Sequence, residues 1–252
     1  MKTAVISGGA GGLGRALADR LQARGYRTFL LDLDVGDLVE TERQVPVACD
    51  LTDRDQLAAA ADRIRQRHPC IDLVIYSAGI TQIGAFADLR DATHRKVFEV
   101  NYFSATALAG ALLQAVRAAG GTHLAISSVA GFAPLFHRTA YAASKHALEG
   151  FFKSLRSEEA LHGVRCQIAA PSFVATNIGN PQLCADGTSR PGAAADGLDL
   201  MSADQAADVI LRGLDSGAPL IPVGRIARLS WWLNSLSPGF FQRLMERNIR
   251  DL

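Results

Sequence analysis

Cysteine is scarce in this sequence, and its few copies are scattered. The 252 residues contain four cysteines and no Cys-x-x-Cys pair: Cys49, Cys70, Cys166 and Cys184. Such scattered cysteines fit reduced thiols better than a disulfide framework or a zinc site. We predict reduced thiols in a cytoplasmic protein that binds no metal.

Excess charge and long hydrophobic runs are missing as well. The formal net charge is +1, which gives no electrostatic basis for binding nucleic acid. The most apolar stretch, 100–116, carries no charge but contains polar side chains, so a buried helix explains it better than a membrane span. The first apolar run of the chain is broken by glycines and is too brief for a signal peptide.

The chain does contain a regular alternation of apolar strand patterns and helix patterns. At 48% hydrophobic and 20% charged residues, it can bury one large core. Strands are expected at 2–7, 27–32, 45–50, 71–76, 123–128, 164–170 and 220–223, with helices between them, including 98–119 and 203–216. This alternation predicts a single α/β domain over 1–223, built on a Rossmann-type doubly wound parallel sheet.

A glycine-rich loop follows the first expected strand and opens the first helix. Gly8, Gly12 and Gly14 permit a tight turn and a close approach of the backbone to a ligand. Because the N-terminus of a helix attracts anions, the loop is a candidate site for the pyrophosphate of a dinucleotide.

Two carboxylates at the end of the second expected strand are candidates for binding the adenosine ribose. Asp32 is favoured by its spacing from the loop, and Asp34 is the alternative. A carboxylate there accepts hydrogen bonds from a 2′-hydroxyl and repels a 2′-phosphate. No base lies inside the loop or directly after Asp32, so NAD is predicted rather than NADP.

Ser128, Tyr141 and Lys145 form the candidate chemical centre. Tyr141 and Lys145 are four residues apart in a helical pattern and share one face. The pKa of a free tyrosine is about 10, and a nearby ammonium is expected to lower it. Ser128 ends an apolar strand, where open α/β sheets place ligand contacts. A surface helix pair and a turn serine are the alternative interpretation.

Asn101 is expected to be buried near the start of the long helix. A buried amide needs hydrogen-bond partners, so a structural bracket is one interpretation of it. A zinc enzyme is disfavoured because His and Cys do not cluster. A serine hydrolase is disfavoured because Ser128 lacks the Gly-x-Ser-x-Gly elbow.

Together these motifs resemble the short-chain dehydrogenase/reductase family from Thr3 to about Val223. The resemblance implies four catalytic residues: Asn101, Ser128, Tyr141 and Lys145. It implies cofactor contacts from the glycine loop, an adenine-binding segment and a carboxamide-binding threonine: Gly8, Gly12, Leu13, Gly14, Asp32, Asp50, Leu51, Ala78, Gly79, Tyr141, Lys145, Pro171, Val174 and Thr176. It also implies a homodimer or homotetramer.

The sequence departs from the family pattern in two places. Tyr76-Ser77-Ala78-Gly79 stands where the family has Asn-Asn-Ala-Gly, which leaves the bracing of the fourth strand unexplained. Ser172 follows Pro171 where glycine is usual, beside the expected nicotinamide pocket. Neither change touches the proton chemistry.

The resemblance implies an NAD(H)-dependent oxidoreductase that interconverts a secondary alcohol and a ketone. Tyr141 would carry the proton, Ser128 would orient the substrate oxygen, and Lys145 would bind the ribose and stabilise the phenolate. Asn101 would hold water in a proton relay. A cofactor-binding sensor or scaffold on the same fold is the alternative, although such a protein has no need of the Tyr141–Lys145 pair.

The end of the chain points to an apolar substrate. Residues 177–202 lack periodicity and are expected to form a lid. The tail, 224–252, is amphipathic and basic and holds both tryptophans. We expect it to cover the pocket or to form a subunit contact, with a shallow membrane contact as the alternative. The predicted apolar pocket residues are Phe132, Leu135, Phe136, Ile178, Leu183, Leu198, Leu200, Met201, Trp231, Trp232, Phe240 and Phe241.

Overall fold

The computed structural model describes residues 1–176 and 200–250. Most of the predicted lid, including Ile178, Leu183 and Leu198, therefore lies outside the described residues. Only its last three residues, 200–202, can be placed.

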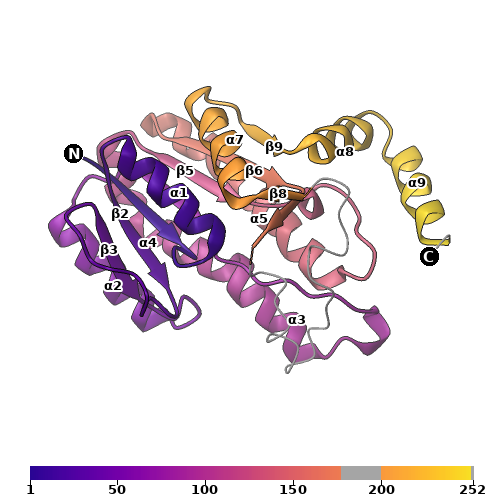
Figure 1. The fold of residues 1–252 in the computed structure, drawn as a ribbon, viewed down its shortest axis with the longest axis horizontal. Coiled ribbons are helices and arrows are strands. Elements are labelled where there is room, and N and C mark those ends of the chain that lie inside the picture. Colours follow the sequence, from indigo (N-terminus) through magenta and orange to yellow (C-terminus); the bar gives the residue numbers. More distant parts are fainter. Residues whose placement is uncertain (177–199, 251–252) are drawn as a thin grey trace.

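The described part of the chain contains a sheet of seven parallel strands (Figure 1). In chain order they are β1 (Lys2–Ser7), β2 (Tyr26–Asp32), β3 (Gln44–Ala48), β4 (Leu73–Tyr76), β5 (Thr122–Ile126), β6 (Arg165–Pro171) and β9 (Leu220–Val223). Their spatial order is β3-β2-β1-β4-β5-β6-β9. The order reverses between β1 and β4, so a crevice is expected beyond the carboxyl ends of these two strands. The predicted doubly wound parallel sheet is confirmed.

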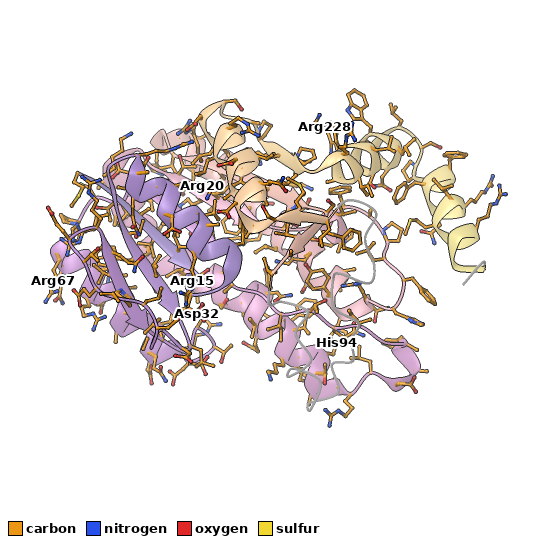
Figure 2. The ribbon with its side chains drawn as sticks, viewed as in Figure 1. Arg15, Arg20, Asp32, Arg67, His94 and Arg228 are labelled. Carbon is orange, nitrogen blue, oxygen red and sulfur yellow. The ribbon has the colours of Figure 1, made fainter. Side chains whose placement is uncertain are left out.

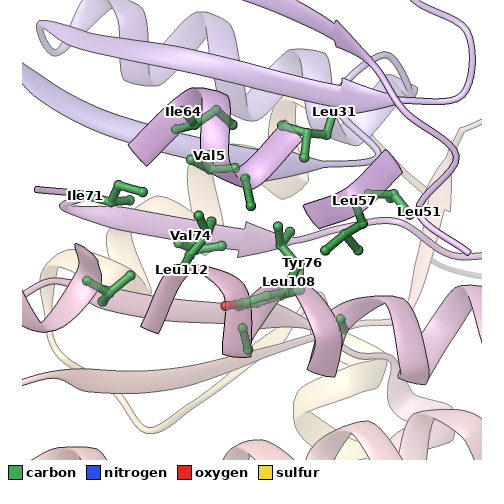
Figure 3. Close-up of a cluster of buried hydrophobic side chains, with 14 of the residues drawn as sticks. Val5, Leu31, Leu51, Leu57, Ile64, Ile71, Val74, Tyr76, Leu108 and Leu112 are labelled. Carbon is green, nitrogen blue, oxygen red and sulfur yellow. The ribbon is translucent and has the colours of Figure 1, made fainter. Parts of the chain in front are cut away.

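Helices cover both faces of the sheet (Figure 1). On one face lie α1 (Gly12–Ala23) and α7 (Ala203–Asp215), and on the other α2 (Arg54–Arg67), α4 (Ser104–Ala119) and α5 (Thr139–Glu159). Alternate residues of β1 serve the two layers, since Val5 packs with α2 and α4 while Ile6 packs with α1 and α7. Figure 3 shows Val5, Val74 and Leu108 in the layer between the sheet and helices α2 and α4.

Local sequence signals set the helix ends. Asp53 caps α2 by accepting hydrogen bonds from the backbone of Asp55 and Gln56. Ser202 and Gln205 form a capping box that starts α7. Gly120 ends α4 in a left-handed conformation.

The helix predicted over 98–119 is interrupted. The helical segment begins at Asp91 rather than Phe98 and runs from α3 (Asp91–Phe98) through a π-helical turn (Glu99–Phe103) into α4. The π-helical turn holds Asn101, and such turns often lie at functional sites.

Short elements complete the described structure. They are the 3-10 turns Phe86–Asp88, Val129–Gly131 and Ala160–His162, the paired strands β7 (Phe173–Ala175) and β8 (Leu200–Ser202), and the tail helices α8 (Arg225–Leu236) and α9 (Pro238–Arg250). The β7–β8 pair was not predicted. The predicted third strand ends at Ala48 rather than Asp50, which leaves Asp50 in the loop that follows.

Tyr76 and His123 connect the middle of the sheet. The Tyr76 hydroxyl and His123 Nδ1 are 2.6 Å apart, and both side chains are buried. Tyr76 also packs against Phe152 of α5. Ser7 Oγ accepts hydrogen bonds from the backbone of Ser77 and Ala78. These contacts brace β4 where the family pattern has two asparagines.

Candidate active site

A cavity of about 960 Å³ opens at the carboxyl ends of the strands. This volume is at the upper end of the range for small-molecule and cofactor sites. Every predicted cofactor contact lines it: Gly8, Gly12, Leu13, Gly14, Asp32, Asp50, Leu51, Ala78, Gly79, Tyr141, Lys145, Pro171, Val174 and Thr176. The parallel sheet brings these distant segments together because its loops all meet at one edge.

Gly8 and Gly14 of the glycine loop are too tightly packed to carry side chains. Gly8 has a positive φ of 68°, and a Cβ there would lie 2.8 Å from the backbone of Ala78. A Cβ on Gly14 would overlap the carbonyl oxygen of Gly8. The loop is therefore packed against the segment that follows β4, at the start of α1, and it lines the cavity, as binding a pyrophosphate requires.

Asp32 lies on the cavity wall at the end of β2, and Arg15 lies nearby on α1 (Figure 2). Both contact Ala10, since Asp32 Oδ2 accepts from the Ala10 N–H at 2.9 Å and Arg15 Nε donates to the Ala10 carbonyl at 2.6 Å. The Arg15 guanidinium also pairs with Asp37 at 2.5 Å. Arg15 directly follows the last glycine of the loop, and its position near Asp32 was not predicted.

Tyr141 and Lys145 project from α5 into the wall of the same cavity. Lys145 Nζ lies 5.8 Å from the centre of the Tyr141 ring and donates a hydrogen bond of 2.9 Å to the carbonyl of Ile126. Ser128 follows β5, and its hydroxyl lies beside that of Tyr141, where it acts to lower the pKa of the phenol. The structure thus brings Ser128, Tyr141 and Lys145 together.

Burial controls the proton affinities of this group. It raises the pKa of Tyr141, although the hydrogen bond from Ser128 and the positive charge of Arg138 act in the opposite direction. Burial also lowers the pKa of Lys145 to about 8, opposed by the negative charge of Glu149. Burial has the largest effect on the Tyr141 pKa, and it acts against the lowering that was expected from Lys145.

Asn101 lies behind the cavity wall rather than on it. Its side chain accepts from the Ile80 N–H at 2.8 Å and donates to the Ile80 carbonyl and the Ser144 hydroxyl, both at 3.0 Å. Gly79 lies against it, because a Cβ added there would be 3.3 Å from Asn101 Oδ1 and 3.5 Å from Lys145 Nζ. Asn101 therefore links the loop after β4 to α5 through hydrogen bonds, which is the structural role that the sequence allowed for it.

A buried carboxylate that the sequence analysis overlooked lies one turn beyond Lys145. Glu149 Oε1 accepts from the Ser127 hydroxyl at 2.8 Å, and Oε2 accepts from Lys153 Nζ at 2.7 Å. A Cβ on Gly131 would overlap both Ser127 Oγ and Glu149 Oε1. The four-residue spacing from Lys145 was the available signal, since it places Glu149 on the same helix face.

Ser172 is accommodated without distorting the wall. Its backbone N–H donates to the Val223 carbonyl at 3.0 Å, and its hydroxyl lies 3.3 Å from the same oxygen. The residue that replaces glycine therefore ties the loop after β6 to β9.

The apolar part of the cavity differs from the predicted one. Among the described residues, its apolar lining includes Leu135, Phe173, Ile226, Phe241 and Met245. Leu135 and Phe241 were predicted. The other described candidates do not line the cavity: Phe132, Phe136, Leu200, Met201, Trp231, Trp232 and Phe240.

The differences have simple causes. Phe132 packs beside Phe241 in a small cluster, and Met201 packs on the layer of α1 and α7. Phe136, Leu200, Trp232 and Phe240 are exposed.

The sequence model of the short chain dehydrogenase family matches residues 2–184. A relative from Bos taurus, "Dehydrogenase/reductase SDR family member 7B", is 34% identical over 262 residues, which cover 98% of this chain and 81% of the relative.

Solved structures are similar along most of the chain. A short chain dehydrogenase from Burkholderia cenocepacia J2315 in complex with NADP gives a TM-score of 0.83 at 25% identity, covering 97% of this chain and 99% of the other. A short chain dehydrogenase/reductase from Burkholderia phymatum in complex with NAD gives 0.77 at 22% identity, covering 87% and 88%, and shows likeness of fold.

The glycine loop, the sheet order and these matches lead to one conclusion. This protein belongs to the short-chain dehydrogenase family.

Proposed function

We propose that the protein is an NAD(H)-dependent oxidoreductase that interconverts a secondary alcohol and a ketone on an apolar, steroid- or lipid-like molecule. One observation carries the proposal. Ser128, Tyr141 and Lys145 lie together on the wall of the cavity that the glycine loop also borders. The candidate proton-transfer groups and the glycine loop therefore face one cavity.

The residues present fit a nicotinamide cofactor. The backbone of the glycine loop can hold the pyrophosphate at the start of α1, and Asp32 can accept hydrogen bonds from the adenosine ribose. Lys145 uses one donor on Ile126 and has two more for the hydroxyls of the second ribose. When bound, the cofactor supplies or accepts the hydride.

The chain's own residues then move and hold the proton. Tyr141 donates its proton to the ketone oxygen or accepts one from the alcohol, and Ser128 orients that oxygen. Because burial raises the pKa of Tyr141, the residue carries its proton at neutral pH and is ready to act as an acid. Below a pH of about 8, Lys145 is positively charged and stabilises the phenolate that proton donation leaves.

Asp32 supports NAD over NADP. A 2′-phosphate at this end of β2 would meet a carboxylate on the cavity wall. The nearby base, Arg15, is paired with Asp37. Because relatives of this fold bind either NADP or NAD, the choice for this chain rests on Asp32.

Apolar lining supports an apolar substrate. Leu135, Phe173 and Phe241 offer surface whose burial contributes about 25 cal/mol per Å². Each methylene added to a substrate should therefore strengthen binding by up to about 0.8 kcal/mol until the space is full.

We further propose a cytoplasmic homodimer or homotetramer, in keeping with a family that commonly forms oligomers. Light scattering of the purified protein measures the assembly. A monomer would remove this part of the proposal and leave the reaction unchanged.

A homologous series of secondary alcohols tests the proposal, with turnover followed by NADH absorbance. We expect kcat/KM to rise with chain length and then level off. Phe241→Ala should flatten this rise, whereas Phe240→Ala, next to it but exposed, should not. A preference for the shortest polar member would contradict the apolar substrate. NADH binding without turnover of any member would favour a sensor or scaffold.

A further inference from the structure

The two tail helices expose apolar side chains that the fold does not need. On α8, Leu229, Trp232 and Leu236 follow the spacing of one helix face, and on α9 so do Phe240 and Leu244. These five side chains are between 37% and 74% exposed. The two helices lie at the end of the molecule opposite β3 and α2 (Figure 1). We call this set the outer tail face.

A neighbouring side of the same helices, about a quarter-turn away, is already explained by the core. Ile226 and Ser230 of α8 and Phe241 and Met245 of α9 line the cavity. Phe241 also packs with Ala227 in a small buried cluster. A surface helix normally has one apolar stripe, so an apolar outer face in addition to this inner one calls for a second apolar environment.

The charge of the tail identifies the environment that fits. Residues 225–250 contain five arginines and one acidic residue, Glu246. Arg228, Arg243 and Arg247 are exposed, and Arg228 projects from α8 in Figure 2. Tryptophan and leucine beside exposed arginines match the boundary between acyl chains and anionic lipid headgroups.

We propose that the outer tail face docks on the surface of an anionic lipid membrane. Its apolar side chains enter the headgroup and acyl boundary, and its arginines bind anionic headgroups. Within residues 1–176 and 200–250, no helix has the length and apolarity that crossing a membrane requires, so the contact is superficial. Docking sets the helices that border the cavity against the bilayer.

A second copy of the chain is a weaker occupant of this face. A two-fold contact brings the same patch of both copies together. The exposed arginines of the two copies would then lie near one another with few acidic partners in the tail. Anionic headgroups supply the opposite charge instead.

The test is co-sedimentation of the full chain with vesicles, without substrate. We expect binding to vesicles of phosphatidylcholine and phosphatidylglycerol, weak binding to phosphatidylcholine alone, and release by salt. Both tryptophans of the chain lie on α8, so their fluorescence should shift to shorter wavelength on binding. The fluorescence measurement uses the wild-type protein, so it does not depend on whether a variant folds.

Paired variants separate the two contributions. Trp232→Ser with Leu236→Ser should weaken vesicle binding at least about tenfold, and Arg228→Gln with Arg243→Gln should weaken it about tenfold or more. The matched controls are Leu161→Ser, an exposed leucine elsewhere, and Arg67→Gln, an exposed arginine on the far side of the molecule (Figure 2). Both controls should bind like the wild type.

Three results would overturn the proposal. The first is no binding to anionic vesicles at low salt, and the second is an equal loss of binding in the control variants. The third is a wild-type dimer that does not bind vesicles and that dissociates when Trp232→Ser and Leu236→Ser are introduced. The last result would make the outer tail face a contact between copies. Because no substrate is present, each of these results leaves the proposed reaction standing.

Discussion

The Ser127 hydroxyl donates a 2.8 Å hydrogen bond to the buried carboxylate of Glu149. Ser127 precedes Ser128 in the loop after β5, and Glu149 lies one turn beyond Lys145 on α5. This bond therefore joins the two segments that carry the candidate proton-transfer groups. Glu149 touches neither the cavity nor a ligand position, so we regard it as a positioning residue.

Glu149→Gln should alter the pH dependence of the reaction. The negative charge of Glu149 raises the pKa of Lys145, in opposition to burial. Without that charge, Lys145 should lose its proton at a lower pH. The fall in the rate of ketone reduction at alkaline pH should therefore begin at a lower pH than in the wild type. The pH profile of kcat/KM measures this shift. Glu159→Gln is the control, since Glu159 is also buried on α5 but pairs with Arg117; it should lower stability without moving the profile.

The wild-type protein should reduce ketones best at neutral pH and oxidise alcohols best at alkaline pH. Reduction needs the protonated form of Tyr141, which burial favours, and the charged form of Lys145, which is lost as pH rises past about 8. Oxidation needs the deprotonated form of Tyr141, so its rate should rise with pH. Initial rates in both directions test this. Parallel pH profiles for the two directions would contradict it.

Asp32→Asn should remove the discrimination against NADPH. The amide keeps one oxygen, which can accept from the backbone N–H of either Ala10 or Leu33, and it loses the charge that repels a 2′-phosphate. The wild-type protein should bind NADH more tightly than NADPH. In the variant, the ratio of the NADPH to the NADH dissociation constant should fall about tenfold, which corresponds to about 1.4 kcal/mol. Asp34→Asn, which changes the neighbouring carboxylate off the cavity wall, should leave the ratio unchanged. Tighter NADPH binding by the wild type would refute the assignment.

Tyr76→Phe should lower the free energy of unfolding by about 1–3 kcal/mol, because His123 Nδ1 would lose a buried partner. Turnover should change little. Urea unfolding measures the loss. Tyr102→Phe, at a partly buried tyrosine on the same side of the sheet, should stay within about 0.5 kcal/mol of the wild type. Equal stabilities for Tyr76→Phe and the wild type would show that the pair does not brace the sheet.

The sheet and the cofactor-binding side of the cavity could be predicted because their signals are local. Short apolar runs such as Lys2–Ser7 specify strands, and the glycines after them specify a loop. Parallel strands then end at one edge, so the residues following β1, β2, β4, β5 and β6 had to meet there.

Features that depend on three-dimensional placement were missed. A π-helical turn at 99–103 keeps an ordinary helical composition, so the sequence reads as one helix. Phe240 and Phe241 are equally apolar, and only the packing of α9 turns Phe241 inward. The raised pKa of Tyr141 depends on how deeply α5 is covered, which spacing from Lys145 does not reveal.

Tyr141→Phe tests the central claim most directly, measured as both turnover and NADH affinity. The change removes the hydroxyl that carries the proton and keeps the ring that lines the cavity. We predict that kcat falls by about 10²- to 10⁴-fold and that the affinity for NADH is nearly unchanged. Lys145→Ala should lower both, because its ammonium is assigned to the ribose and the phenolate. If Tyr141→Phe retained most of the oxidoreductase activity, Tyr141 would not be the acid–base group and the proposed mechanism would fail.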